Sequence, residues 1–169
     1  MTKHKLFISY YHKDDEIYRN KFEDLFGDLF INKSVKIGDI NDDVRTEYIK
    51  RLIRENYISD TSVVVVLIGP HTHCRKHVDW EISAGLLNNA GLVGLILPNH
   101  NCFGKGNCNP EDLPDRLVEN LKTGYGLLYD WTENRYEMKN IIENAFENKL
   151  KKPEDKVNPK KQMKQDRCS

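Results

Sequence analysis

The sequence predicts a doubly wound α/β domain, in which helices cover both faces of a central, mainly parallel five-stranded sheet. The first observation is the unbroken apolar run Val63–Ile68, which is rich in β-branched residues. Such a run is typical of a strand that is buried on both faces, as the strands of parallel sheets are. The second observation is a similar run at 91–98. Between the two runs, Val78, Ile82 and Leu86 recur every four residues, as on the apolar face of a helix.

The segments before residue 61 extend this alternation of strands and helices. Residues 5–10 are predicted to form the first strand, and Asp14 and Asp15 are expected to cap the helix that follows. The apolar face of that helix comprises Tyr18, Phe22, Leu25, Phe26 and Leu29. A short strand is expected at 35–38, followed by a polar loop and a second amphipathic helix. The apolar face of this helix comprises Val44, Tyr48, Ile49, Leu52 and Ile53.

The segments after residue 61 complete the predicted domain. They comprise strands at 62–69, 91–98 and 127–131 and helices at 74–89 and 113–122. A final helix has the apolar positions Met138, Ile141, Ile142, Ala145 and Phe146. The order of these segments predicts a flavodoxin-like fold with three layers over residues 1–150.

Residues 151–169 are predicted to form a basic, disordered C-terminal tail. They contain almost no apolar residues that could be buried against the domain. We therefore expect deletion of the tail to leave the thermal stability of the domain nearly unchanged.

Charge and composition exclude several classes of partner. The chain has 26 Lys and Arg residues and 26 Asp and Glu residues, so its net charge is zero. Seven basic and three acidic residues lie in 151–169, which leaves 19 basic and 23 acidic residues in 1–150. A weakly acidic domain lacks the basic face that nucleic-acid binding requires. We therefore expect no nucleic-acid partner.

The sequence also bears on cellular location. No apolar run approaches the roughly 20 residues of a membrane span, and no signal peptide precedes the first strand. The four cysteines, Cys74, Cys102, Cys108 and Cys168, include no Cys-x-x-Cys pair. We expect a cytoplasmic protein with reduced thiols and no membrane partner.

Two phosphate-related motifs are absent. The sequence contains no Gly-x-x-x-x-Gly-Lys-Ser/Thr loop, and Gly104-Lys-Gly106 is an isolated pattern within a predicted loop. A phospho-receiver domain of the same topology needs an acceptor aspartate at the end of the third strand. Gly69 and Pro70 occupy that place here, which argues against this function.

Histidine spacing suggests a metal site only weakly. His73 and His77 are four residues apart, as zinc ligands on a helix often are, but no strong ligand accompanies them elsewhere in the sequence. His100 with Cys102 and Cys108 forms a still weaker pattern. We therefore expect no metal site.

Glu81 is the strongest candidate for chemistry. It lies in the helix after the third predicted strand, and open α/β sheets bind ligands in the crevice beyond the carboxyl ends of their strands. His77 lies one turn earlier, and Trp80 is an adjacent aromatic ring that can stack on a planar group such as nicotinamide or adenine. The alternative is a solvated helix residue that pairs with Arg75 or Lys76.

Four segments carry a resemblance to a known family. Phe7-Ile-Ser-Tyr10 is similar to the opening motif of TIR domains, and Leu128–Trp131 resembles a later strand of the family. The most specific segments are Thr61–Gly69 and Arg75–Ile82. Over residues 4–150 the chain resembles the TIR-like family of the Thoeris anti-phage system.

This resemblance implies a catalytic residue and a reaction. In the family the glutamate of this helix is catalytic, which corresponds to Glu81, and the preceding aromatic residue is matched by Trp80. The chain departs from the family at His77, where the family often has Trp. The implied reaction cleaves NAD at the nicotinamide–ribose bond, with NAD as substrate and no other cofactor.

The resemblance also implies partners. The expected product is an ADP-ribose-type signal, in a cyclic form, that diffuses to a separate effector protein. A phage-derived trigger and assembly into a homo-oligomer are further expectations of the resemblance.

Other substrate-binding residues are expected at the ends of the first two strands. Ser9, Tyr10 and Tyr11 end the first strand, and Asp39 and Asn41 follow the second. Both strand ends should flank the same crevice as the candidate glutamate. For each of these residues, strand-end capping or turn formation is an equally good explanation.

Two other functions remain open at this stage. One is a TIR-like interaction module without catalysis, whose surface helices assemble a signalling complex. The other is a nucleoside deoxyribosyltransferase, which uses a glutamate in a related fold. Loss of NAD, or exchange of nucleosides without loss of NAD, would distinguish among the three functions.

Overall fold

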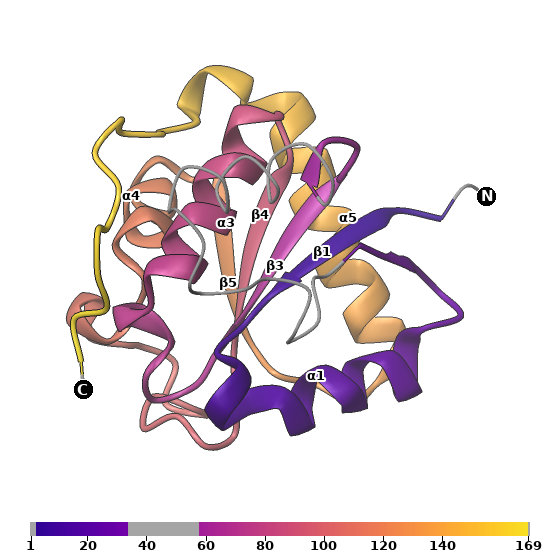
Figure 1. Ribbon diagram of the computed structural model, residues 1–169. Helices are drawn as coiled ribbons and strands as arrows, with labels where there is room; N and C mark the ends of the chain where they lie inside the picture. Colours follow the sequence, from indigo (N-terminus) through magenta and orange to yellow (C-terminus); the bar gives the residue numbers. More distant parts are fainter. Residues whose placement is uncertain (1–2, 34–57, 169) are drawn as a thin grey trace.

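A computed structural model describes residues 3–33 and 58–168 of the chain. Within these ranges, five parallel strands form one sheet in the order β2-β1-β3-β4-β5 (Figure 1). The strands are β1 (Lys5–Ser9), β2 (Ile31–Asn32), β3 (Val63–Ile68), β4 (Gly91–Ile96) and β5 (Gly126–Asp130). The topology confirms the predicted flavodoxin-like fold. The strand predicted at 35–38 and the helix predicted around 44–53 lie outside the described residues.

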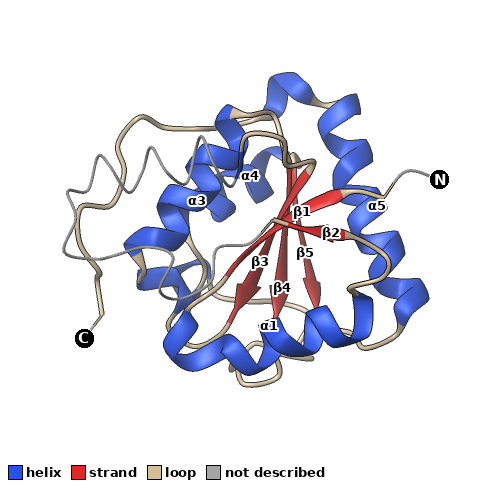
Figure 2. Cartoon of the chain, turned by 45° about the vertical axis from the view of Figure 1, so that its right-hand side comes forward, coloured by secondary structure: helices blue, strands red, loops and turns tan. Residues whose placement is uncertain are grey.

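Helices cover both faces of the sheet (Figure 2). They are α1 (His12–Phe26), α3 (Lys76–Leu87), α4 (Asp115–Thr123) and α5 (Arg135–Lys151). One apolar cluster joins α1 and α5 to the sheet and includes Phe22, Phe26, Met138 and Ile142. The other joins α3 and α4 to the opposite face and includes Val78, Ile82, Leu86 and Leu117. The predicted apolar stripes therefore face the sheet.

Strand β3 lies at the centre of both clusters. Val63, Val65 and Leu67 belong to the α1–α5 cluster, whereas the alternate residues belong to the α3–α4 cluster. Because both faces of β3 are covered, its sequence is apolar at every position. A Cβ atom on Gly85 of α3 would lie 2.3 Å from Val64 Cγ2, so the glycine allows α3 to approach this strand closely.

Two helix starts differ from the prediction. Helix α1 begins at His12, and the side chain of the preceding Tyr11 makes no capping bond. The predicted caps are wrong because Asp15 is fully buried inside the domain rather than turned to the helix end. The second difference is that residues 72–74 form a separate 3₁₀ turn, so that α3 begins at Lys76.

The tail after α5 runs along α3 and α4 (Figure 1) and is anchored by Arg116 of α4. The Arg116 side chain is buried, and its Nε and Nη2 atoms donate to the two carboxylate oxygens of Asp79 over 2.9 and 3.3 Å. Nη1 donates to Asn158 Oδ1 and to the Pro159 carbonyl over 2.9 and 2.7 Å. Nη2 also donates to the Lys161 carbonyl over 2.9 Å. All five N–H groups of the guanidinium therefore have acceptors.

Further bonds hold the tail to α3 and α4. The Trp80 indole donates to the Met163 carbonyl over 2.7 Å, and the Met163 N–H donates to Asp79 over 2.9 Å. Asn120 exchanges two bonds with the backbone of Val157, of 2.8 and 2.9 Å. These bonds use backbone groups of the tail, and they do not require apolar side chains, so the composition of the tail gives no sign of them.

The cysteines also differ from the prediction of reduced thiols. The structure joins Cys74 to Cys168 and Cys102 to Cys108 as disulfides, with Cα–Cα distances of 5.6 and 5.2 Å. The first pair is 94 residues apart in sequence, so no local pattern indicates it. Within the described ranges, no helix is long and apolar enough to cross a membrane.

Candidate active site

Glu81 lies on α3, the helix that follows the carboxyl end of β3, and it is buried with 5% of its surface exposed. The alternative of a solvated surface residue is therefore wrong. Arg75 instead pairs with Asp166 of the tail, and the ammonium group of Lys76 lies 5.6 Å from the ring centre of Trp80. In the described part of the chain, no basic side chain forms an ion pair with Glu81.

Burial controls the charge of Glu81. Desolvation raises the pKa of the carboxyl group to about 8, and the neighbouring Ser9 hydroxyl only partly opposes this shift. The carboxyl group is therefore largely neutral at pH 7 in the absence of a ligand. A cation placed next to it would favour the ionised form.

Two of the residues predicted on β1 lie beside Glu81. Ser9 ends β1 and is fully buried, and its hydroxyl oxygen forms no hydrogen bond within the standard distance to any described residue. It nevertheless lies close enough to Glu81 to favour the ionised carboxylate. Tyr10 is also buried, and burial raises its pKa to about 12, with a small contribution from the charge of Glu81. The structure thus gathers Ser9, Tyr10 and Glu81.

The other predicted residues are placed differently. The ring of Tyr11 lies under the Arg75 guanidinium, 3.8 Å from its carbon. Trp80 is 2% exposed and bonds to the tail, so its ring faces protein rather than open space. His77 packs against Trp80, with ring centres 5.0 Å apart. Stacking of Trp80 on a substrate ring therefore does not fit this structure.

Asp39 and Asn41, predicted to follow the second strand, lie outside the described residues. The structure therefore describes the side of the site that β1 and α3 form.

A buried carboxylate that the sequence suggested only as a helix cap lies at the same end of the sheet. Asp15 accepts a hydrogen bond from Asn99, 2.9 Å away, and a longer one of 3.4 Å from Thr72. Burial raises the pKa of Asp15, and these two bonds partly oppose the shift. Thr72 in turn accepts from the Gly69 N–H over 2.9 Å. Asp15 thereby ties α1 to the loops that follow β3 and β4.

A parallel sheet with a buried glutamate near its carboxyl edge defines the molecule as a TIR-like α/β domain. A family model described as the TIR-like domain of the Thoeris protein ThsB matches residues 7–101, more than half of the chain. The chain therefore belongs to the Thoeris ThsB TIR-like family and has a role in anti-phage defence. The match contains Ser9, Tyr10 and Glu81. No curated protein matches the chain.

Proposed function

We propose that this protein cleaves NAD at the nicotinamide–ribose bond and that Glu81 is its catalytic carboxylate. The observation that carries the proposal is the burial of Glu81 beside the Ser9 hydroxyl, with no cationic partner among the described residues. Buried groups with strongly shifted pKa values concentrate at functional sites. Family membership supports an NAD-processing reaction in particular.

The chemistry suits a single carboxylate. The bond between ribose C1′ and the nicotinamide nitrogen breaks, and its electron pair returns to the positively charged ring, which leaves as a neutral molecule. The ribose develops oxocarbenium character, which an ionised Glu81 would stabilise at short range. Because the substrate itself brings positive charge, its arrival would favour loss of the proton from the Glu81 carboxyl group.

The fate of the ribose cation decides the product. Attack by water at C1′ followed by loss of a proton gives ADP-ribose, whereas attack by a nucleophile of the same molecule gives a cyclic product. A site that excludes water favours the cyclic product, because the internal nucleophile then has less competition. We propose a cyclic ADP-ribose-type product, in keeping with the burial of Glu81.

The proposed product acts on a second protein. In this proposal the diffusible nucleotide activates a separate effector protein, which produces the response. A phage-derived trigger and self-assembly would control the enzyme, and NAD in the cytoplasm would be its substrate. These parts of the proposal extend the family role in defence.

The test uses Glu81→Gln, which keeps the size of the side chain and removes its charge. Glu147→Gln on the exposed face of α5 is the matched control, since among the described residues Glu147 pairs with Lys151 alone, at 3.7 Å on the surface. Lysates of triggered cells are passed through a membrane that retains protein and are added to the purified effector. Wild-type and control filtrates should activate it, whereas the Glu81→Gln filtrate should not. Activation that requires the intact protein in contact with the effector would favour the interaction module instead.

A further inference from the structure

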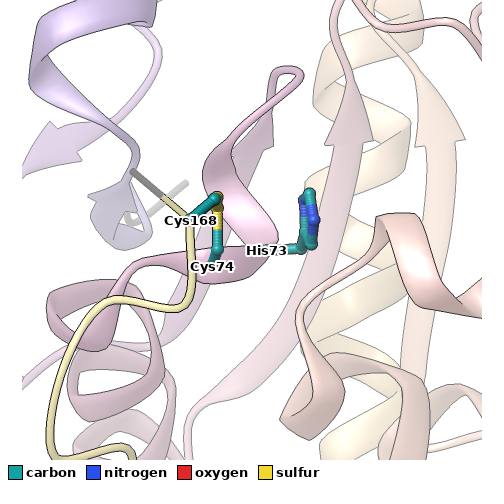
Figure 3. A group of neighbouring side chains, drawn as sticks. All are labelled: His73, Cys74 and Cys168. Atoms are coloured by element: carbon teal, nitrogen blue, oxygen red, sulfur yellow. A yellow bond between two sulfur atoms is a disulfide. The ribbon is translucent and has the colours of Figure 1, made fainter.

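The C-terminus and the turn before α3 bring together three groups that bind soft metals. Cys168 lies beside Cys74, and His73 is next to Cys74 in the same 3₁₀ turn (Figure 3). One nitrogen of His73 and the two sulfur atoms all lie within 4.8 Å of one another. The sequence argument against a metal site relied on the lack of a distant ligand, and the docked tail supplies one.

The tail holds Cys168 in place without help from a sulfur–sulfur bond. The Arg167 N–H donates to the Cys74 carbonyl over 2.9 Å. The Lys76 N–H, at the start of α3, donates to the Asp166 carboxylate over 2.9 Å. These bonds flank both cysteines, so reduction of the disulfide would leave two thiols facing each other.

His73 has the properties of an available ligand. Its Nδ1 atom is buried and has no hydrogen-bond partner within the described ranges. His100, in the similar cluster with Cys102 and Cys108, differs because both of its nitrogens are occupied. Its Nδ1 accepts from the Cys102 N–H over 3.0 Å, and its Nε2 lies 3.2 Å from the Asp112 carbonyl.

We propose that His73, reduced Cys74 and reduced Cys168 form a site for a thiophilic divalent ion such as Zn²⁺, which clasps the tail to the start of α3. In a tetrahedral zinc site, bonds of about 2.3 Å to sulfur and 2.1 Å to nitrogen place the ligand atoms about 3.6–3.8 Å apart. To reach that spacing, the two sulfur atoms must separate when the disulfide is reduced, and the His73 nitrogen, which lies within 4.8 Å of both, must move closer to them. Water completes the four ligands, and the site is separate from the proposed reaction at Glu81.

A cellular thiol can serve as the reductant of the Cys74–Cys168 disulfide. Two thiol molecules reduce the Cys74–Cys168 disulfide to two cysteine thiols and become one disulfide themselves. Binding of the ion by both sulfurs as thiolates then releases two protons. A compartment with a reducing thiol pool would maintain this reduced state.

The experiment uses the full chain in a trialkylphosphine reductant, with Co²⁺ as a coloured probe and Zn²⁺ as competitor. We expect one tightly bound Co²⁺ with a tetrahedral visible spectrum and a thiolate charge-transfer band, both lost on addition of Zn²⁺. Cys168→Ser should roughly halve the intensity of the charge-transfer band, because one of two thiolates is lost. It should weaken Co²⁺ binding at least tenfold, since the loss of residues that only hydrogen-bond to metal ligands already costs about that much. His73→Asn should weaken binding to a similar degree.

The matched control is the double variant Cys102→Ser, Cys108→Ser, which leaves the proposed ligands intact and should bind Co²⁺ as the wild type does. Cys168 is only partly buried and belongs to neither apolar cluster, so its replacement does not disturb the core. Zn²⁺ should also slow hydrogen exchange of residues 157–168 in the wild type but not in Cys168→Ser. Three results would each overturn the proposal. They are the absence of stoichiometric Co²⁺ binding, Co²⁺ binding that Cys168→Ser leaves unchanged, and a Cys74–Cys168 disulfide that persists in the reductant.

Discussion

Asp79 and Glu81 are neighbouring carboxylates of α3 with contrasting surroundings. Both are buried, with 8% and 5% of their surfaces exposed. Asp79 accepts two bonds from Arg116 and a third from the Met163 backbone. Glu81 has no described cation beside it, and burial raises its pKa to about 8.

The difference in hydrogen-bond and charge partners indicates different roles for the two carboxylates. A buried charge with a full set of partners holds the fold together, and its removal leaves the partner uncompensated. A buried carboxyl group without partners costs stability when it ionises, and a protein retains such a group where a ligand uses it. On this reasoning Asp79 anchors the tail, whereas Glu81 is the residue that we propose acts on substrate.

The largest expected effect is on activity at Glu81. Glu81→Gln should lower NAD turnover at least 100-fold, because removal of a group that stabilises transition-state charge costs about 10²–10³ in rate. Loss of nicotinamide release, measured with purified protein beside Glu147→Gln, would support the assignment. Turnover at the wild-type rate in a clean Glu81→Gln preparation would remove Glu81 from the mechanism.

The next effect is on stability at Arg116. Arg116→Met should lower the free energy of unfolding by about 3–5 kcal/mol, because it leaves the buried Asp79 charge unpaired. Urea unfolding measures the change. Arg135→Met is the control, since Arg135 pairs with Asp28 on the surface at 2.7 Å and should contribute little. If the two variants lost the same free energy of unfolding, the buried ion pair would contribute no more to stability than the exposed one, and the prediction would be wrong.

Deletion of the tail should have a smaller effect. A chain that ends at Lys156 loses the acceptors at Asn158, Pro159 and Lys161, but it retains the bonds between Arg116 and Asp79. Water can reach the exposed donors, so with the Cys74–Cys168 disulfide reduced in both proteins we expect the free energy of unfolding to fall by about 1–3 kcal/mol. A melting temperature equal to that of the full chain would show that the docked tail adds no stability.

A separate effect is the pH dependence of stability that Glu81 contributes. Its pKa in the folded protein, about 8, lies above its ordinary value of 4.5, so the folded state binds one more proton between these pH values. The stabilisation is complete below pH 4.5 and is lost as the pH rises to about 8, by about 1.4 kcal/mol per unit at most. Relative to Glu81→Gln, the wild type should lose stability over this window. Parallel stability curves for the two proteins would show that Glu81 is not desolvated.

Local patterns in the sequence predicted the framework of the domain. The apolar run of β3 and the four-residue repeat of α3 predicted a parallel sheet with a covering helix, and their order placed Glu81 near the carboxyl edge. These predictions succeeded because burial on one or both faces imposes a period on the residues themselves. Ser9 and Tyr10 were predictable for the same reason, since they follow the apolar residues of β1.

Tertiary structure alone decided how the buried polar groups are satisfied. Asp15 looked like a helix cap and instead joins Asn99 and Thr72 inside the domain, and Trp80 is turned to the tail rather than to the site. The tail contacts α4 through its own backbone carbonyls, and it brings Cys168 to Cys74 across 94 residues. Hydrogen bonds between distant backbone and side-chain groups impose no period on the sequence, so only the folded chain shows which donors and acceptors meet.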